Sequence, residues 1–531
     1  MKFEEKLKCE GRKEVFDEYC SFMDLNIEEY MQIQKSLLKE QILLFTNSKL
    51  GESIIGNRKI ETIDDFRKYV PLTTYEDYAD ILLLKDDSYL PKEASLWIET
   101  TWEGGKHPVK VAPYSKGMIE TFFTNMCACM LIATGEKRYD FDVRKEYHML
   151  YGLAPLPYAT GLLPLGLDNQ IGVQLLPDVK TANSMSFSER NKLGFKQGLT
   201  EGIEYFFGLG SVTYYISKSL DKMNGSSGGV EIGKLLRHPK RLFRLLRGKL
   251  KAKSENRPLL PRDLFDLKGF VVAGTDNELY KDDLEKMWGK RPLEIFAGTE
   301  PTLIGTELYS RNGMIFFPDA CFYEFILEED LEKERKNPDY KVPTYLMDEV
   351  VPNCNYEIVI SVLKGGAFMR YRVGDIYRCV STYDRLDNVK LPMFKYIDRV
   401  KDVIDIAGFT RITKNSIDEV IKLSHLDIVD YIAAKEIIDN RPYLHLYIEM
   451  DPKSVISDAV CITVIKDHLT AYFKFVDDDY HDLKKILGVD PLIVTILKNG
   501  TLSRYPEEIA RINPSLHDIS RMLKYMSEAE S

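Results

Sequence analysis

Two short runs in the second half of the chain contain the side chains best suited to chemistry. Residues 366–375 read Gly-Ala-Phe-Met-Arg-Tyr-Arg-Val-Gly-Asp, and residues 398–402 read Asp-Arg-Val-Lys-Asp. A Tyr-Arg-x-Gly-Asp turn would let the Asp375 carboxylate accept hydrogen bonds from two neighbouring hydroxyls, which a nucleotide ribose offers. Arg399 then supplies a planar fork of N–H donors that suits ribose and phosphate oxygens. Gly-Asp turns are common and usually structural, so neither run alone predicts a nucleotide site.

A third run lies upstream, at residues 291–307, and reads Arg-Pro-Leu-Glu-Ile-Phe-Ala-Gly-Thr-Glu-Pro-Thr-Leu-Ile-Gly-Thr-Glu. Its β-rich first part should form a strand, and the small residues that follow should form a turn. We expect Phe296 to lie against an adenine ring and Thr299 to donate to an α-phosphate. Glu300 would hold Mg²⁺, because hard cations prefer oxygen ligands. Taken alone, this run reads more readily as a strand that ends in an ordinary turn with a solvated glutamate.

Further short runs along the chain are informative when they are taken together with the three runs above. They are Asp64-Asp65-Phe66, Tyr69-Val70-Pro71-Leu72, Tyr75-Glu76-Asp77, Pro157-Tyr158-Ala159-Thr160-Gly161, Gly274-Thr275-Asp276, Phe322-Tyr323-Glu324-Phe325, Tyr356-Glu357-Ile358-Val359, Asp479-Tyr480 and Gly500-Thr501-Leu502. With the three runs above, they resemble the auxin-responsive (Gretchen Hagen) acyl acid–amido synthetase family of the adenylate-forming superfamily. The resemblance extends from about residue 40 to about residue 510.

The resemblance implies an α/β fold in two parts. Residues 1–397 would form a large multi-sheet N-terminal domain of the adenylate-forming type, with the nucleotide and acyl pockets. Residues 398–531 would form a smaller, mobile α+β C-terminal domain after a hinge near Lys401. Rotation at such a hinge would let one protein serve two half-reactions in turn.

The implied activity is the ATP-dependent conversion of a carboxylic acid to an acyl-adenylate, followed by transfer to an amine such as an amino acid. Coenzyme A stays open as the alternative acceptor, and ATP and Mg²⁺ are the expected cofactors. The catalytic assignments are Thr299, Glu300, Arg399 and Lys401, with Glu300 as the metal ligand. Phe296, Thr299, Asp375 and Arg399 are assigned to the nucleotide, and Tyr158, Thr160, Gly161 and Gly298 to the acyl substrate.

The phosphate loop departs from the superfamily pattern, in which small residues let backbone N–H groups close around phosphate oxygens. Trp102 and Glu103 stand where small residues are expected, and a carboxylate beside a triphosphate is repulsive. Two interpretations remain: a working loop in a shifted register, or a non-catalytic family member with a degenerate loop. The residues available to a working loop are Thr100, Thr101, Gly104, Gly105, Lys106 and Lys110.

Composition narrows the class of protein. A net charge of −10 over 531 residues argues against nucleic acid as the main partner. The eight cysteines are scattered and the N-terminus has no apolar signal core, so we expect free thiols and a cytoplasmic location. The longest apolar stretch, residues 122–134, contains Asn125 and is too short to span a bilayer. It is typical of a core helix that opens near Ser115 and closes at Gly135, and we expect no transmembrane segment.

Residues 234–257 are a compositional outlier, with ten Lys or Arg, one acid and interleaved leucines. A basic amphipathic helix of this kind could touch an anionic membrane surface. A solvated connecting helix packed on the core is the favoured reading, because related sequences carry similar insertions.

Overall fold

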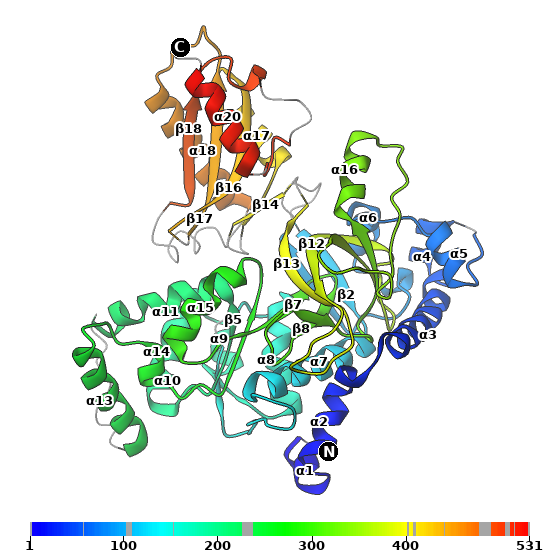
Figure 1. Cartoon of the computed structure of the whole chain (residues 1–531), viewed down its shortest axis with the longest axis vertical. Coiled ribbons are helices and arrows are strands. Elements are labelled where there is room, and N and C mark those ends of the chain that lie inside the picture. The colour runs from blue at the N-terminus through cyan, green and yellow to red at the C-terminus, as the bar shows by residue number, and fades with distance from the viewer. Residues whose placement is uncertain are drawn as a thin grey trace. The chain divides into compact units, whose positions relative to one another are not determined.

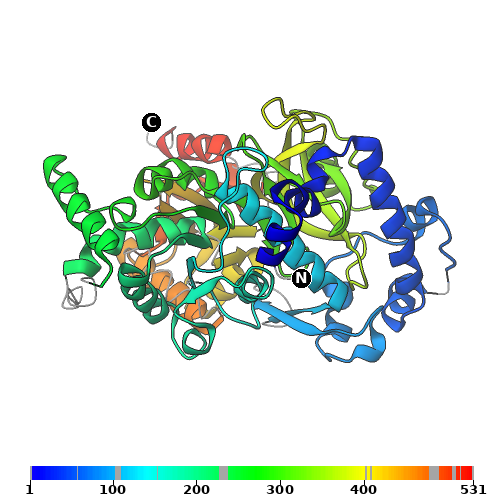
Figure 2. The same cartoon turned by 90° about the horizontal axis from the view of Figure 1, so that it is seen from below.

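The computed structural model describes residues 3–56, 58–101, 109–151, 153–225, 237–400, 403–406, 410–439, 441–476, 490–504, 510–514 and 516–528. The chain forms two compact units. The first contains residues 1–100, 110–335 and 339–397, and the second contains residues 101–109, 336–338 and 398–531. Figures 1 and 2 show the helices and strands of each unit.

The first unit begins with helices, as the apolar periodicity of the N-terminal region indicates. They are α1 (Phe3–Cys9), α2 (Arg12–Cys20), α3 (Ile27–Thr46), α4 (Lys49–Ile55), α5 (Ile63–Tyr69) and α6 (Glu76–Leu82). Asn26 and Glu29 form a reciprocal capping box at the start of α3, and Thr62 and Asp65 do the same for α5. Both caps fix where the chain turns into a helix and therefore how these segments reach the sheet.

One eleven-stranded mixed sheet organises the unit, in the order β10-β11-β12-β13-β9-β8-β7-β6-β5-β3-β4. The strands from β4 to β7 pair in parallel, whereas β7, β8, β9 and β13 pair antiparallel. The bounds are β3 (His148–Leu150), β4 (Gln174–Leu176), β5 (Tyr205–Leu209), β6 (Gly269–Ala273), β7 (Leu293–Gly298), β8 (Thr302–Glu307), β9 (Met314–Phe316), β10 (Cys321–Leu327), β11 (Asn355–Val362), β12 (Tyr371–Ser381) and β13 (Met393–Arg399). A separate two-stranded sheet pairs β1 (Leu96–Thr101) with β2 (Val109–Tyr114).

Aromatic side chains of the antiparallel strands stack on one another in the core. The ring of Phe394 lies 4.8 Å from Phe316 and 5.1 Å from Phe325, nearly parallel to both. All three side chains are fully buried, so the residues of β9, β10 and β13 share one core.

Helices cover the sheet and connect its strands. They are α7 (Lys116–Thr134), α8 (Leu162–Gln170), α9 (Val179–Ala182), α10 (Phe187–Glu201), α11 (Gly210–Gly225), α13 (Pro239–Ser254), α14 (Pro261–Leu264), α15 (Asn277–Trp288) and α16 (Glu328–Lys336). Among the described residues, α7 alone is long and apolar enough to cross a bilayer, but 72% of its apolar window is buried inside the unit. Ser115 caps α7 and Gly135 ends it, which confirms the prediction of a core helix.

The second unit, described by itself, is a smaller α+β structure. A three-stranded sheet in the order β16-β17-β18 contains β16 (Ile428–Ile438), β17 (Arg441–Met450) and β18 (Leu492–Leu497). A hairpin and three helices accompany it: β14 (Val403–Ile406), β15 (Thr410–Thr413), α17 (Lys414–Ser424), α18 (Asp458–Val476) and α20 (Leu516–Glu528). The α/β class predicted from the sequence is therefore confirmed.

Candidate active site

The turn between β7 and β8 carries two of the predicted site residues. The two strands pair antiparallel as far as Gly298 opposite Thr302, which leaves Thr299 and Glu300 in the connecting turn, as the sequence predicts. The hydroxyl of Tyr114, on β2, donates to the carbonyl of Thr299 at 2.7 Å and lies 3.2 Å from the carbonyl of Gly298. These contacts fix the backbone that presents the Thr299 hydroxyl and the Glu300 carboxylate.

Glu300 is the centre of a polar cluster drawn from three segments of the chain. Its Oε1 atom accepts from the Lys110 ammonium at 2.9 Å and from the Tyr371 hydroxyl at 2.7 Å. The Lys110 Nζ atom also lies 3.2 Å from the Tyr371 hydroxyl. Only 11% of the Glu300 side chain and 15% of the Lys110 side chain are exposed, so each charge depends on the other for compensation.

Tyr75 supports this cluster from the N-terminal segment. The Lys110 ammonium lies 5.1 Å from the centre of the Tyr75 ring, within the range of a cation–π contact. The Tyr75 hydroxyl donates to the carbonyl of Val111 at 3.0 Å. Burial, together with the nearby Glu300 charge, raises the pKa of Tyr75 to about 12. Tyr75 is therefore a neutral ring that positions β2 and Lys110.

Asp375 lies in strand β12, so the prediction of a Tyr-Arg-x-Gly-Asp turn is wrong in form. The pairing of β11 with β12 shifts register between Glu357 and Val359, and this irregularity lies opposite residues 373–375. Gly374 has φ +80, a left-handed conformation that favours glycine. A β-bulge rather than a turn therefore sets the direction of the Asp375 carboxylate, which is 3% exposed.

An arginine–glutamate pair stands beside Asp375. The Arg372 guanidinium binds both carboxylate oxygens of Glu357, at distances from 2.6 to 3.1 Å. Burial raises the pKa of Glu357, the Arg372 contact opposes this shift, and the charge of Asp375 adds to it. The charges of Asp375 and Glu357 are therefore close enough to act on each other.

Phe296, assigned to the adenine, belongs to a partly exposed aromatic group. Its ring lies 5.2 Å from the Tyr377 ring, which in turn lies 5.6 Å from Tyr396. Phe296 is half-buried at the end of β7, so part of its ring remains available for stacking.

A buried ion pair fixes the start of β12 and also contacts the segment around residues 64–77. Arg370 binds both oxygens of Glu324 at 2.9 Å, and its other amino group donates to the carbonyls of Arg67 and Val70. The backbone of Thr73 bonds on either side, to the Arg370 carbonyl and the Arg372 amide, at 2.9 Å each. The segment around residues 64–77 therefore fixes the position of Tyr371.

The predicted acyl loop forms a short 3-10 turn, Ala159–Gly161. The Thr160 hydroxyl donates to the carbonyl of Ala154 at 2.9 Å, and the carbonyl of Pro157 accepts from the Glu99 amide at 2.9 Å. A Cβ atom on Gly161 would come within 2.3 Å of the Leu156 backbone. The hydrogen bond between Glu99 and Pro157 attaches the loop to β1. The substrate role of Tyr158, Thr160 and Gly161 stays a prediction.

The other predicted site residues are distributed as follows. Thr100 and Thr101 end strand β1, whereas Gly104, Gly105, Lys106 and Lys401 lie outside the described residues. Arg399, at the end of β13, belongs to the second unit, where its Nε atom lies 3.8 Å from the buried Asp405 carboxylate. Its role at a ribose therefore stays a prediction.

Sequence reasoning left Tyr371 out of the site and treated Lys110 only as part of the phosphate loop. The signals were present, because Tyr371 opens the Tyr-Arg-x-Gly-Asp run and Lys110 stands shortly before Pro113. Among the described residues, no group of three or more His, Cys, Asp or Glu is placed to hold a metal. A magnesium site needs fewer protein ligands, because one or two carboxylates together with substrate phosphates suffice. Glu300, in the β7–β8 turn, can supply one such carboxylate.

The chain is similar to a known protein family and to several solved structures. Residues 314–399, which include Tyr371 and Asp375, match the GH3 family central domain. No curated protein matches the sequence. The structure is similar to that of the acyl acid amido synthetase AtGH3.15 in complex with 2,4-DB, with 15% identity, TM-score 0.54, and 97% of this chain and 96% of that chain covered. It is also similar to 2-hydroxyisobutyryl-CoA ligase in complex with 2-HIB-AMP and CoA, with 14% identity, TM-score 0.58, and 94% and 93% covered. Residues 314–399 are therefore similar to the GH3 family central domain, and the chain shares the fold of these two ligases, as the resemblance seen in the sequence predicts.

Proposed function

We propose that the protein is an ATP-dependent ligase that activates a carboxylic acid as its acyl-adenylate and transfers the acyl group to an amine. The observation that carries this proposal is the buried cluster of Glu300, Lys110 and Tyr371 at the β7–β8 turn. It joins the two motifs that the resemblance assigns to the triphosphate and to the ribose. A buried carboxylate paired with a lysine from a distant strand is costly to desolvate, and its place in the motif that the resemblance assigns to phosphate and Mg²⁺ supports a functional role.

In the first half-reaction, a carboxylate oxygen of the acid attacks the α-phosphorus of ATP, and pyrophosphate leaves with the electrons of the broken P–O bond. Phe296 would stack on adenine, Asp375 would accept from the ribose hydroxyls, and Thr299 would donate to the α-phosphate. Glu300 would hold Mg²⁺, which supplies charge neutralisation on the phosphates when it is bound.

Lys110 would balance negative charge in the site. Lys110 lies at the start of β2, at the end of the predicted phosphate loop, and its ammonium lies 2.9 Å from Glu300. A cation there compensates Glu300 before the nucleotide enters and offsets phosphate charge afterwards. The site would therefore be preorganised for a polyanion, which is where most of the rate enhancement in phosphoryl chemistry arises.

In the second half-reaction, the amine nitrogen attacks the acyl carbon of the adenylate, AMP leaves, and the nitrogen loses a proton. Coenzyme A is the competing acceptor, and one of the similar structures is a coenzyme A ligase. The match of residues 314–399 to the GH3 family favours the amine. The acyl acid is expected to meet the loop that contains Tyr158, Thr160 and Gly161, together with Gly298.

The test is an AMP-release assay on the purified full chain with Mg²⁺, ATP and a panel of aryl, alkyl and 2-hydroxy acids. Each acid is offered with amino acids, with simple amines or with coenzyme A, and the products are identified by mass. The proposal expects acid-dependent AMP release that yields an amide. Thioester formation would move the proposal to the coenzyme A alternative. The absence of acid-dependent AMP and pyrophosphate across the panel would support the non-catalytic reading that Trp102 and Glu103 suggest.

A further inference from the structure

Helix α13 (Pro239–Ser254) presents an apolar stripe to solvent. Phe243 is 67% exposed, Leu246 53% and Leu250 70%. The spacing of three and four residues places all three side chains on one face of the helix. Both views of the structure show α13, coloured green, standing out from the rest of the first unit (Figures 1 and 2). This stripe therefore does not pack on the core of the first unit.

The opposite face of α13 packs on the first unit through small residues, and the large apolar side chains of the stripe take no part in that contact. Only Gly248 and Ala252 are buried on it. A Cβ atom on Gly248 would meet the backbone and side chain of Asp263, on α14, at 2.7 Å. A small-residue contact thus fixes the helix close to α14 (Pro261–Leu264) and turns the stripe outward.

Helix α13 carries seven basic residues and no acidic residue. The basic residues are Lys240, Arg241, Arg244, Arg247, Lys249, Lys251 and Lys253. Arg241 and Arg244 reach inward to Glu204 and Asp266, at 3.8 and 2.9 Å. On a helical projection, Arg247 follows the stripe on one side, and Lys249 and Lys253 lie on the other.

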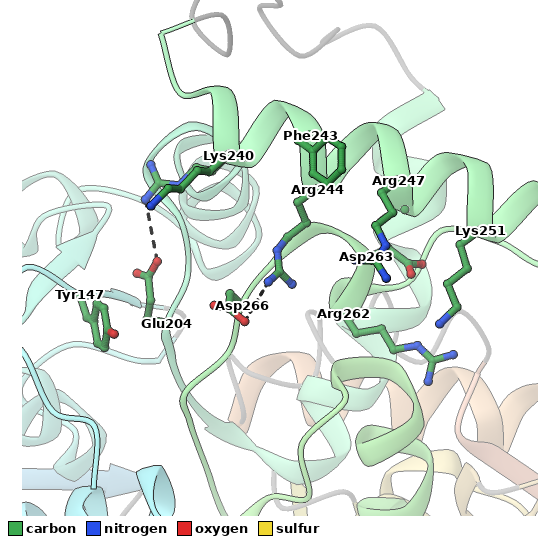
Figure 3. Close-up of a pocket in the computed structure, with 12 residues that line it drawn as sticks. Tyr147, Glu204, Lys240, Phe243, Arg244, Arg247, Lys251, Arg262, Asp263 and Asp266 are labelled. Carbon is green, nitrogen blue, oxygen red and sulfur yellow. Dashed lines mark ion pairs between the residues drawn. The ribbon is translucent and has the colours of Figure 1, made fainter.

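A groove of about 700 Å³ runs along the base of the helix on the Arg247 side. Figure 3 shows Lys240, Arg244, Arg247 and Lys251 descending from α13 along it, with Arg262 opposite. The three acids that line it are engaged, since Asp266 pairs with Arg244, Asp263 pairs with Arg257 at 2.6 Å, and Glu204 lies 3.8 Å from Arg241. The groove therefore keeps a positive character next to the apolar stripe.

We propose that α13 is a peripheral docking surface for an anionic membrane. The stripe Phe243–Leu246–Leu250 enters the boundary between headgroups and acyl chains, and the flanking lysines and arginines meet lipid phosphates and carboxylates. Apolar residues on one face with Lys and Arg beside them are typical of helices that lie in the plane of a bilayer surface. The helix lies on the membrane and does not span it.

Charge distinguishes this occupant from a second copy of the chain. The protein as a whole carries −10, so an anionic surface repels most of it and attracts this helix. Two copies of α13 placed face to face would instead bring two sets of basic residues together without a compensating acid on either helix.

The experiment is co-sedimentation of the full-length protein with vesicles of phosphatidylcholine alone, or of phosphatidylcholine with phosphatidylserine. We expect binding only to the anionic vesicles, weakened by salt. The combined variant Phe243→Ser, Leu246→Ser and Leu250→Ser should reduce the partition coefficient by about tenfold or more. The variant Arg247→Gln, Lys249→Gln and Lys253→Gln should do the same, and both should unfold at the wild-type temperature because these side chains are exposed.

Matched controls remove side chains of the same kind from elsewhere on the surface. Leu84→Ser with Leu386→Ser removes residues that are 63% and 72% exposed, and Lys116→Gln with Lys286→Gln removes exposed lysines. Binding should be unchanged in these proteins. Absent binding to anionic vesicles, equal binding to neutral ones, or full binding by the apolar variant would overturn the proposal. Sedimentation velocity without vesicles completes the test, because a dimer that the apolar variant abolishes would assign the stripe to a second copy and refute the membrane.

Discussion

The Tyr371 hydroxyl donates to the Glu300 carboxylate at 2.7 Å, which joins two motifs that are 71 residues apart in the sequence. Lys110 completes the contact from a third segment, 190 residues before Glu300. The consequence is that the metal-binding candidate and the strand that carries Asp375 cannot move independently. We therefore expect a change at any of the three side chains to alter the binding or the reaction of ATP.

Replacement of Glu300 by Gln keeps the shape of the side chain and its contact with Tyr371, but it leaves the buried Lys110 ammonium without its compensating charge, so the free energy of unfolding should fall as well as the rate. The rate of acid-dependent pyrophosphate release should fall by about 100-fold or more, since the charge that would hold Mg²⁺ is lost. A phosphate-coupled assay across a range of magnesium concentrations measures this. Wild-type rates in the Gln variant would remove Glu300 from the metal site.

Replacement of Tyr371 by Phe deletes one hydrogen bond to a charged group, which is typically worth about 1.5–3 kcal/mol. We expect kcat/KM for ATP to fall by about tenfold to a hundredfold, with unchanged secondary structure by circular dichroism. Tyr340→Phe is the matched control, because its hydroxyl donates to Asp330 at 2.8 Å and lies outside the site. Equal losses in both variants would mean that the Tyr371 effect is general rather than local.

Arg370 should be important for stability rather than for chemistry. Replacement of Arg370 by Met leaves the buried Glu324 without its main partner and should cost about 3–5 kcal/mol of unfolding free energy. Addition of Glu324→Gln should recover much of that loss. Arg335→Met, which breaks the half-exposed pair with Glu332, should change stability by less than about 1 kcal/mol. Urea denaturation measures all four proteins, and a double variant no better than Arg370→Met would show that the burial of Glu324 is not the cause.

Glu357 gives a pH-dependent prediction. Burial raises the pKa of Glu357 above its ordinary value, despite its contact with Arg372. The folded chain therefore holds this proton more tightly than the unfolded chain, and stability is lost as pH rises from the ordinary glutamate value through the raised pKa. The Glu357→Gln variant does not titrate at this position, so the stability of the wild type relative to the variant should decrease over that range. Thermal unfolding of both proteins between about pH 4 and pH 8 tests this, and parallel curves would be inconsistent with a raised pKa.

Much of the fold was predictable because its signals are local. The N-terminal helices, core helix α7 and the strand–turn that presents Thr299 and Glu300 follow from periodicity, caps and small residues in sequence. The bulge at Asp375 was not predictable, because Gly-Asp is typical of turns and only pairing with β11 makes it part of a strand.

The site could be predicted only as separate motifs. The contact between Lys110 and Glu300 depends on how β2 packs beside the β7–β8 turn, and no spacing rule relates residues so far apart. The exposure of the α13 stripe could not be predicted for a similar reason. Helical periodicity shows that Phe243, Leu246 and Leu250 share a face, but Gly248 against α14 decides which face is buried.

Nucleotide binding is the most direct test of the central claim, because it does not require knowledge of the acid or the acceptor. Calorimetric titration of ATP with Mg²⁺ into the full chain should show one saturable site. Binding should disappear in Asp375→Ala, which removes the buried carboxylate on β12, and persist in Asp348→Ala, which removes an exposed one. The account is contradicted if the wild type shows no binding with or without candidate acids, or if Asp375→Ala binds ATP as the wild type does.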